Sequence, residues 1–203
     1  MTATKDLDDI EAIKGLIQAF FDRVNANDPP GLQALFVPNA HLTILRQDPP
    51  RPPPPSSSGA YLPQPPTPTP IKEQEEQDNK ISLIYQSTIE AFIKLIQDGN
   101  RRKKPGDKPV PTVHEVPNLA ATDVRVDGDF AQAWCPFTVT FDGVLHHYGF
   151  FAYTFGKTRE RSVGKDGGEG EGKRKEWRFE GLTQDYRRTP GWEGDGESEL
   201  MYV

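Results

Sequence analysis

The sequence predicts an α+β fold in which helices come first and then pack on one face of an antiparallel sheet. Apolar residues recur at helical spacing between Ile10 and Val24, which predicts an N-terminal helix. Two Asp-Gly pairs, Asp127-Gly128 and Asp142-Gly143, each lie between alternating apolar runs, a pattern typical of β-hairpins. Only 34% of the 203 residues are hydrophobic, whereas 20 are proline and 18 glycine, so the apolar residues must be concentrated in part of the chain.

The N-terminal segment predicts two helices and a short strand. The first helix is expected from Asp8 to about Asn25. Asp28 precedes two prolines, as is typical of an N-cap with proline in the first turn, so a short second helix should follow. The β-branched, alternating run at 41–46 (HLTILR) then predicts a strand.

A single domain is expected to span residues 1–190. Two inserts interrupt this domain, and a tail follows it. Residues 48–80 are proline-rich, and 11 of the 22 residues from Pro49 to Pro70 are proline, which favours an extended segment. Residues 157–176 form a charged, glycine-rich loop, and the acidic tail at 191–203 is expected to be disordered.

A further amphipathic helix is expected between the two inserts. Its apolar stripe extends from Ile84 to Ile96, with an internal start signal at Ser87 and Glu90 and a stop at Gly99.

Three consecutive strands are expected near 113–126, 129–141 and 144–156, and a fourth at 177–188. Two-residue turns would place Phe141 opposite Val144 and Val126 opposite Asp129, and alternation then sorts the side chains into two faces. The inner, apolar face would collect Val124, Val126, Ala131, Ala133, Cys135, Phe137, Val139, Phe141, Val144, His146, Tyr148, Phe150 and Ala152. The outer face would collect Asp123, Arg125, Gln132, Trp134, Thr138, Thr140, His147, Phe151, Tyr153 and Phe155.

This division predicts a pocket and an interaction surface. The pocket wall is expected to include Phe20, Cys135, Phe137 and Phe150, with His146 and Tyr148 as its unusual polar members. The outer aromatic patch of Trp134, Phe151 and Tyr153 predicts a homodimer or another partner. A β-bulge, which Pro117 or Pro136 could mark, would exchange His146 for His147 on the inner face.

Composition argues against several functional classes. The net charge of -6 and the pI of 5.3 argue against nucleic acid as a partner. No apolar run approaches the roughly 18 residues of a membrane span, and the single cysteine cannot form an internal disulfide, so a cytoplasmic protein is expected, with the nucleus left open. The sequence contains no cofactor-binding motif, so no cofactor is expected. No metal site is expected either, because His146 and His147 should lie on opposite faces of one strand and could not bind the same ion.

The order of four segments resembles the NTF2-like superfamily and its SnoaL-like branch, which includes scytalone dehydratase, polyketide cyclases and ketosteroid isomerase. The segments are NANDPPGLQALFVPNA, TVHEVPNL, DVRVDGDFAQAW and WRFEGLTQDYRR. The resemblance covers residues 8–46 and 82–190. It implies a cone-shaped fold, with a curved, mostly antiparallel sheet and the N-terminal helices packed on its concave face.

The resemblance also suggests site residues. His114 matches a catalytic histidine of scytalone dehydratase, and Asp185 matches an acid on the terminal strand of SnoaL-type cyclases. Val24, Asn25 and Ile44 occupy positions where the related enzymes carry tyrosine or aspartate.

Two functions follow as hypotheses. The first is a small-molecule-binding protein whose cone holds a hydrophobic or polyketide-like ligand, with lyase, cyclase or isomerase chemistry through His146, Tyr148, Asp185 and His114 and no cofactor. The second is a non-catalytic NTF2-like dimerisation or adaptor protein that acts through its sheet face and proline-rich insert.

Overall fold

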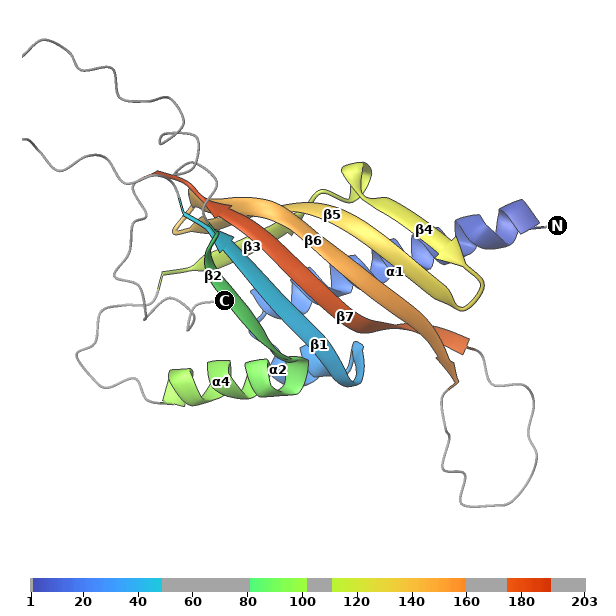
Figure 1. Ribbon diagram of the computed structural model, residues 1–203, viewed down its shortest axis with the longest axis horizontal. Helices are drawn as coiled ribbons and strands as arrows, with labels where there is room; N and C mark the ends of the chain where they lie inside the picture. Colours follow the sequence, from blue (N-terminus) through green and yellow to red (C-terminus); the bar gives the residue numbers. More distant parts are fainter. Residues whose placement is uncertain (1, 49–80, 102–110, 160–174, 191–203) are drawn as a thin grey trace, which may run out of the picture.

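The computed structural model describes residues 2–48, 81–101, 111–159 and 175–190. These residues form a curved seven-stranded sheet in the order β2-β1-β7-β6-β5-β3, with β4 also paired to β5 (Figure 1). All pairs are antiparallel except β1 and β7, which are parallel. The α+β prediction is confirmed. Of the expected insert at 48–80 only Asp48 is described, and the tail at 191–203 lies outside the described residues.

In the described parts of the chain, three α-helices accompany the sheet: α1 (Thr2–Asn25), α2 (Pro29–Gln33) and α4 (Ile89–Arg101). In Figure 1, α1 runs behind the sheet, against its inner face. The α1 stripe Ile13, Ile17, Phe20 and Phe21 is buried in the core. The Asp28 cap is confirmed, because its side chain accepts a hydrogen bond from the Gly31 amide at 3.0 Å.

The segment before α4 corrects one prediction. Strand β1 (Phe36–Gln47) pairs with β2 (Ile81–Thr88), so Ile84 belongs to a strand opposite Leu45 and not to the expected helix. Pairing with β1 overrides the helical spacing of the apolar residues. The helix begins after Thr88, whose hydroxyl accepts a hydrogen bond from the Ala91 amide at 3.3 Å, one residue from the predicted start at Ser87.

The expected long strand at 113–126 is divided into β3 (Val113–Pro117) and β4 (Asp123–Asp127). Between them lies one 3₁₀ turn (Leu119–Ala121), which Asn118 caps. Because Pro117 has no backbone N–H, it cannot continue the ladder of hydrogen bonds, and pairing of β3 ends there.

The sheet is completed by β5 (Phe130–Phe141), β6 (Val144–Arg159) and β7 (Lys175–Arg188), so both β6 and β7 reach into the segment 157–176 that was expected to be a loop. The Asp142-Gly143 turn has positive φ at both residues, 50° and 82°, and places Phe141 opposite Val144 as predicted. In the first hairpin, Val126 pairs with Ala131 and not with Asp129. This shift of two residues leaves the faces unchanged.

A β-bulge at His146 overturns the face assignment of β6. Thr140 pairs with Leu145 and Val139 with His147, so His146 is the extra residue on β6. Every later side chain of β6 therefore lies on the face opposite to the one predicted. Tyr148 and Phe150 are 44% and 40% exposed on the outer surface, and the prediction that they face inward is wrong.

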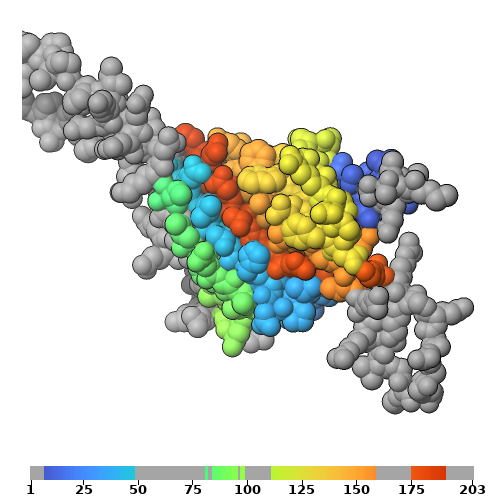
Figure 2. All heavy atoms as spheres, turned by 45° about the vertical axis from the view of Figure 1, so that its right-hand side comes forward, coloured from blue at the N-terminus to red at the C-terminus, as the bar shows by residue number. Residues whose placement is uncertain are grey.

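The same bulge places Phe151, Tyr153 and Phe155 in the core, although they were expected on the outer face. Trp134 lies outside as predicted, with 57% of its surface exposed. Figure 2 shows the sheet as a surface, across which the side chains of β2, β1, β7, β6 and β5 follow in green, cyan, red, orange and yellow.

The bulge also brings the two adjacent histidines together. His146 and His147 are both buried, and their Nδ1 atoms lie 2.7 Å apart, so one ring donates a hydrogen bond to the other. The prediction that they point to opposite faces is wrong. Burial, with the nearby positive charge of Arg188, lowers the pKa of His146 to about 4 and that of His147 to about 3.

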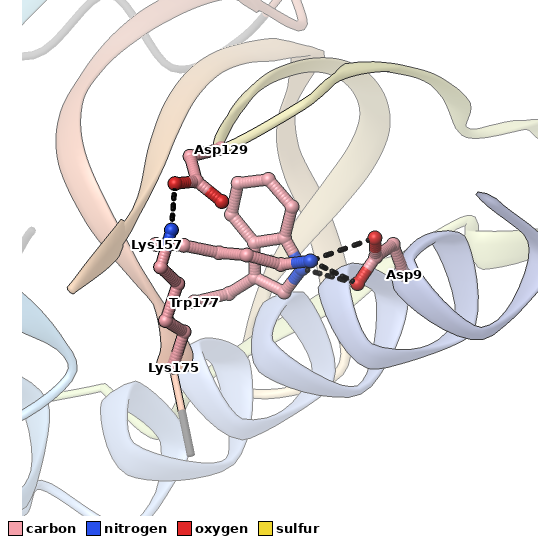
Figure 3. A network of polar contacts seen from close by, with 5 residues as sticks. All are labelled: Asp9, Asp129, Lys157, Lys175 and Trp177. Atoms are coloured by element: carbon pink, nitrogen blue, oxygen red, sulfur yellow. Dashed lines mark hydrogen bonds and ion pairs between the residues drawn. The ribbon is translucent and has the colours of Figure 1, made fainter. Parts of the chain in front are cut away.

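The N-terminal part of α1 is held to the sheet by a partly buried ion pair (Figure 3). Lys157 Nζ lies 2.7 Å from Asp9 Oδ1, and the two side chains are only 10% and 14% exposed. Trp177 Nε1 donates to the same carboxylate at 3.1 Å, and the Lys157 ammonium lies 4.8 Å from the centre of the Trp177 ring. Lys175 pairs with Asp129 beside this cluster.

Replacing Asp9 should be costly because it leaves Lys157 as an unpaired, desolvated cation. Asp9→Ala is expected to lower the free energy of unfolding by about 3 kcal/mol in urea denaturation. The double variant Asp9→Ala/Lys157→Met should recover part of this loss. Asp123→Ala, which breaks an exposed pair with Arg125, is the control and should change little. Equal effects of Asp9→Ala and Asp123→Ala would contradict this role for the ion pair.

Candidate functional site

A cavity of about 350 Å³ lies between the inner face of the sheet and the helices. Its walls come from α1, α2, α4, β1, β3, β6 and β7, and they are mainly apolar, including Phe20, Leu42, Ile44, Phe92, Phe151 and Leu182. The volume lies within the range of roughly 300–1,000 Å³ typical of small-molecule sites. The cavity is therefore the candidate binding site.

Glu115 is a buried acid in this cavity. It lies on the inner face of β3 opposite Val139, and only 4% of its surface is exposed. Among the described residues, no hydrogen bond or ion pair to its carboxyl group is found, and burial is the one cause of its shifted pKa. Burial raises the pKa of Glu115 to about 7, so the acid and its carboxylate are both populated near neutral pH.

Asn25, at the end of α1, fixes the position of Glu115. The Asn25 Nδ2 donates to the backbone carbonyl of Glu115 at 2.8 Å, and the Glu115 amide donates to Asn25 Oδ1 at 2.8 Å. The amide side chain thus pairs with the free edge of β3 as another strand would. Since both side chains line the cavity, this contact builds part of its wall.

Gln184 is the second buried polar residue in the cavity wall. It lies on β7 between Ile44 of β1 and Phe151 of β6, and 2% of its surface is exposed. Within the described part of the chain, its Nε2 has no hydrogen-bond acceptor. A hydrogen-bond donor without an acceptor is therefore present in a residue of this wall.

Tyr153 is a third buried polar group near the site. Burial raises its pKa, and the neighbouring Cys135 and Glu115 raise it further. Its hydroxyl has no hydrogen-bond partner among the described residues. Tyr153 therefore stays a neutral phenol close to Glu115.

The predicted pocket residues are distributed differently. Phe20 lines the cavity. Cys135 and Phe137 are buried in the core but are not part of the cavity wall, and burial raises the pKa of the Cys135 thiol. Phe150 lies on the outer surface because of the bulge.

The four predicted catalytic residues do not meet. His146 is buried beside His147, whereas Tyr148 and His114 are exposed. Asp185 is partly exposed on the face of β7 opposite to Gln184, where it accepts a hydrogen bond from Gln47 at 2.7 Å. None of the four is among the residues that line the cavity.

Two of the residues that the resemblance suggests lie next to residues of the cavity wall. His114 and Asp185 are each adjacent to a residue that does line the cavity, Glu115 and Gln184. Because side chains alternate along a strand, adjacent residues face opposite sides. The pairing of β3 with β5 places Glu115 beside Val139 on the apolar face, and this pairing is the signal that could have identified Glu115 as a residue of the cavity wall.

The described residues contain neither a metal-binding group nor a membrane-spanning helix. No group of three or more His, Cys, Asp or Glu side chains in these parts of the chain is placed to hold a metal ion. No helix within them has the length and apolar character needed to cross a membrane.

Comparison with known proteins identifies the fold. No family model and no curated protein matches the sequence. A protein from Novosphingobium aromaticivorans, described as the β subunit of an aromatic-ring-hydroxylating dioxygenase, is similar in structure, with a TM-score of 0.54 at 12% identity over 91% of this chain and 92% of that one.

A variant of the Mycobacterium tuberculosis protein Rv3472, whose function is unknown, matches with a TM-score of 0.55 at 11% identity, over 99% of this chain and 87% of that one. An NTF2-like protein with a cystatin-like fold from Novosphingobium aromaticivorans has a TM-score of 0.49 at 17% identity, over 98% and 92% of the two chains. The two structures with TM-scores of 0.54 and 0.55 share the fold of this chain, a curved sheet with helices on its inner face, in agreement with the fold that the order of the sequence motifs predicts.

Proposed function

We propose that the chain binds a small apolar molecule in the cavity and that Glu115 moves a proton to or from it. The observation that carries this proposal is a buried carboxyl group, without a partner in the described chain, in the wall of an apolar cavity. Its pKa of about 7 suits a group that must both accept and release a proton near neutral pH.

The chemistry needs two proton transfers. The Glu115 carboxylate removes a proton from a C–H or O–H group of the ligand, and the resulting acid returns it to another atom or to a departing hydroxyl group. Such a sequence is sufficient for isomerisation, dehydration or cyclisation. Glu115 has this role in preference to His146, Tyr148, Asp185 or His114 because it alone of the five lines the cavity.

A model base reaction tests Glu115 without knowledge of the natural ligand. Nitrobenzisoxazole is a small uncharged molecule that loses a C–H proton to a base, whereupon its N–O bond breaks and a coloured phenolate forms. The protein should accelerate this reaction, with kcat/KM rising with pH to a plateau above about 7. Glu115→Gln should lower kcat/KM by about 100-fold or more, because the amide is not a base.

His114→Ala is the matched control, since it changes the exposed neighbour of Glu115, and it should leave the rate within about twofold. Glu115→Asp, which keeps the carboxyl group, should retain part of the activity. A rate in Glu115→Gln equal to that of the unmodified protein would disprove the role of Glu115 as the base.

The burial of Glu115 also makes stability depend on pH. The folded protein holds the proton up to a pH of about 7, whereas the unfolded chain releases it near 4.5, so this group lowers the free energy of unfolding as the pH rises from about 4.5 to 7. The full penalty is about 3 kcal/mol. Glu115→Gln removes it.

The variant should therefore be more stable than the unmodified protein at pH 8 and similar to it at pH 4.5, in urea denaturation at both values. His146 and His147 have lowered pKa values and destabilise both proteins equally below about pH 6.5, so the difference between the two isolates Glu115. A difference that does not change with pH would contradict the burial of an ionisable carboxyl group.

A second candidate function, dimerisation or another protein contact, rests on the outer face of the sheet. Its exposed aromatic residues are Phe130, Trp134, Tyr148 and Phe150, and the rings of Trp134 and Phe150 meet edge to face with centroids 6.2 Å apart. Phe151 and Tyr153, which were expected to join this surface, are buried in the protomer. Exposed aromatic patches of this kind are typical of protein interfaces.

Trp134→Glu should shift the protein towards monomer in size-exclusion chromatography, because it places a charge in the aromatic patch. Leu7→Glu, which changes an exposed apolar residue of α1, is the control and should not alter the apparent mass. An unchanged apparent mass for Trp134→Glu would contradict a homodimer formed through this face, and contact with a different partner would then be the remaining proposal for it.

A further inference from the structure

Gln184 is a buried donor that the proton transfer does not use. A buried N–H group without an acceptor costs about 1–3 kcal/mol. The nearest side chains on its own face are Ile44 and Phe151 across the sheet and Leu182 and Tyr186 along β7, and none of them accepts a hydrogen bond from Nε2. Gln184 lines the cavity, so the occupant of the cavity can supply the acceptor that Nε2 lacks.

The charges of the cavity limit that occupant further. Glu115 is its buried acid, and among the described residues of the wall the cation is Arg23, which is 51% exposed and paired with Asp28 at 2.9 Å. A ligand carboxylate or phosphate inside would meet no free buried cation among these residues and would be repelled by Glu115 above pH 7. The ligand should therefore be uncharged.

Gln184 and Glu115 lie on different strands of the wall, β7 and β3, with β6 and β5 between them in the sheet. A ligand that reaches both would present its acceptor to β7 and its exchanging proton to β3. These two contacts would fix its orientation, whereas the apolar wall would bind its body without direction.

We propose that Gln184 is a specificity-determining residue that donates a hydrogen bond from Nε2 to an oxygen of the ligand. The cavity then selects uncharged molecules that carry one accepting oxygen on an apolar body. This inference rests on the proposed function, because it concerns the same cavity, but Gln184 takes no part in the proton transfer.

Three bicyclic probes of similar size test the selection: tetralone with one carbonyl oxygen, tetralin without it, and tetralin carboxylate with a negative charge. Calorimetry should show that the unmodified protein binds tetralone about five- to tenfold more tightly than tetralin, as expected for one net hydrogen bond, and the carboxylate most weakly. Gln184→Leu should bring the ratio of tetralone to tetralin close to one.

Gln132→Leu makes the same change at an exposed position on the outer face of β5 and should keep the preference for tetralone. Gln184→Met is the second variant if Gln184→Leu folds poorly, and it should lose the preference in the same way. Persistence of the preference in either Gln184 variant, or its absence in the unmodified protein, would overturn the role of Gln184.

The base reaction separates this inference from the proposed function. Glu115→Gln should lose nitrobenzisoxazole turnover but keep the preference for tetralone over tetralin, because Gln184 is unchanged in that variant. If turnover is lost in Glu115→Gln but the tetralone preference survives in Gln184→Leu, the inference fails and the proposed function stands. If neither substitution has its effect, both fail.

Discussion

The pairing of the Asn25 side chain with the backbone of Glu115 is the contact on which the candidate site depends. An edge strand presents N–H and C=O groups that no neighbouring strand satisfies, and Asn25 satisfies both of those of Glu115 at 2.8 Å. One amide thereby ends the sheet at β3, joins it to the last turn of α1 and places the Glu115 carboxyl group in the cavity between them.

The opposite end of α1 is held by a different kind of contact, the Asp9 carboxylate with Lys157 and Trp177. Between the two ends, Phe20 and Phe21 pack edge to face with Phe151, with ring centroids 5.6 Å apart in both pairs. Directional contacts at the ends and apolar packing between them keep the helix over the sheet while leaving a cavity open beneath its C-terminal half.

The cavity carries groups that lower the stability of the empty protein. Glu115 and Gln184 are both almost fully buried. In the described chain Nε2 of Gln184 has no partner, and burial alone shifts the pKa of Glu115, so an apolar residue would fill either position at lower cost. Functional sites commonly contain such unfavourable groups, because a bound molecule supplies the missing contacts. This cost is the physical basis for assigning both residues to ligand binding and chemistry.

The N-terminal helix, the Asp28 cap, the Asp142-Gly143 turn and the apolar face of β5 follow from the amino-acid sequence alone, because each depends on residues close together in the chain. The strand at 81–88, the bulge at His146 and the cavity residues Glu115 and Gln184 do not. Each of these depends on which strand lies alongside: β1 pairs with residues that otherwise favour helix, and one extra residue opposite Val139 reverses all later side chains of β6. Because side chains alternate along a strand, an error of one residue in the register exchanges the inner face for the outer face. Only the pairing of distant strands therefore places Glu115 and Gln184, and not His114 and Asp185, against the cavity.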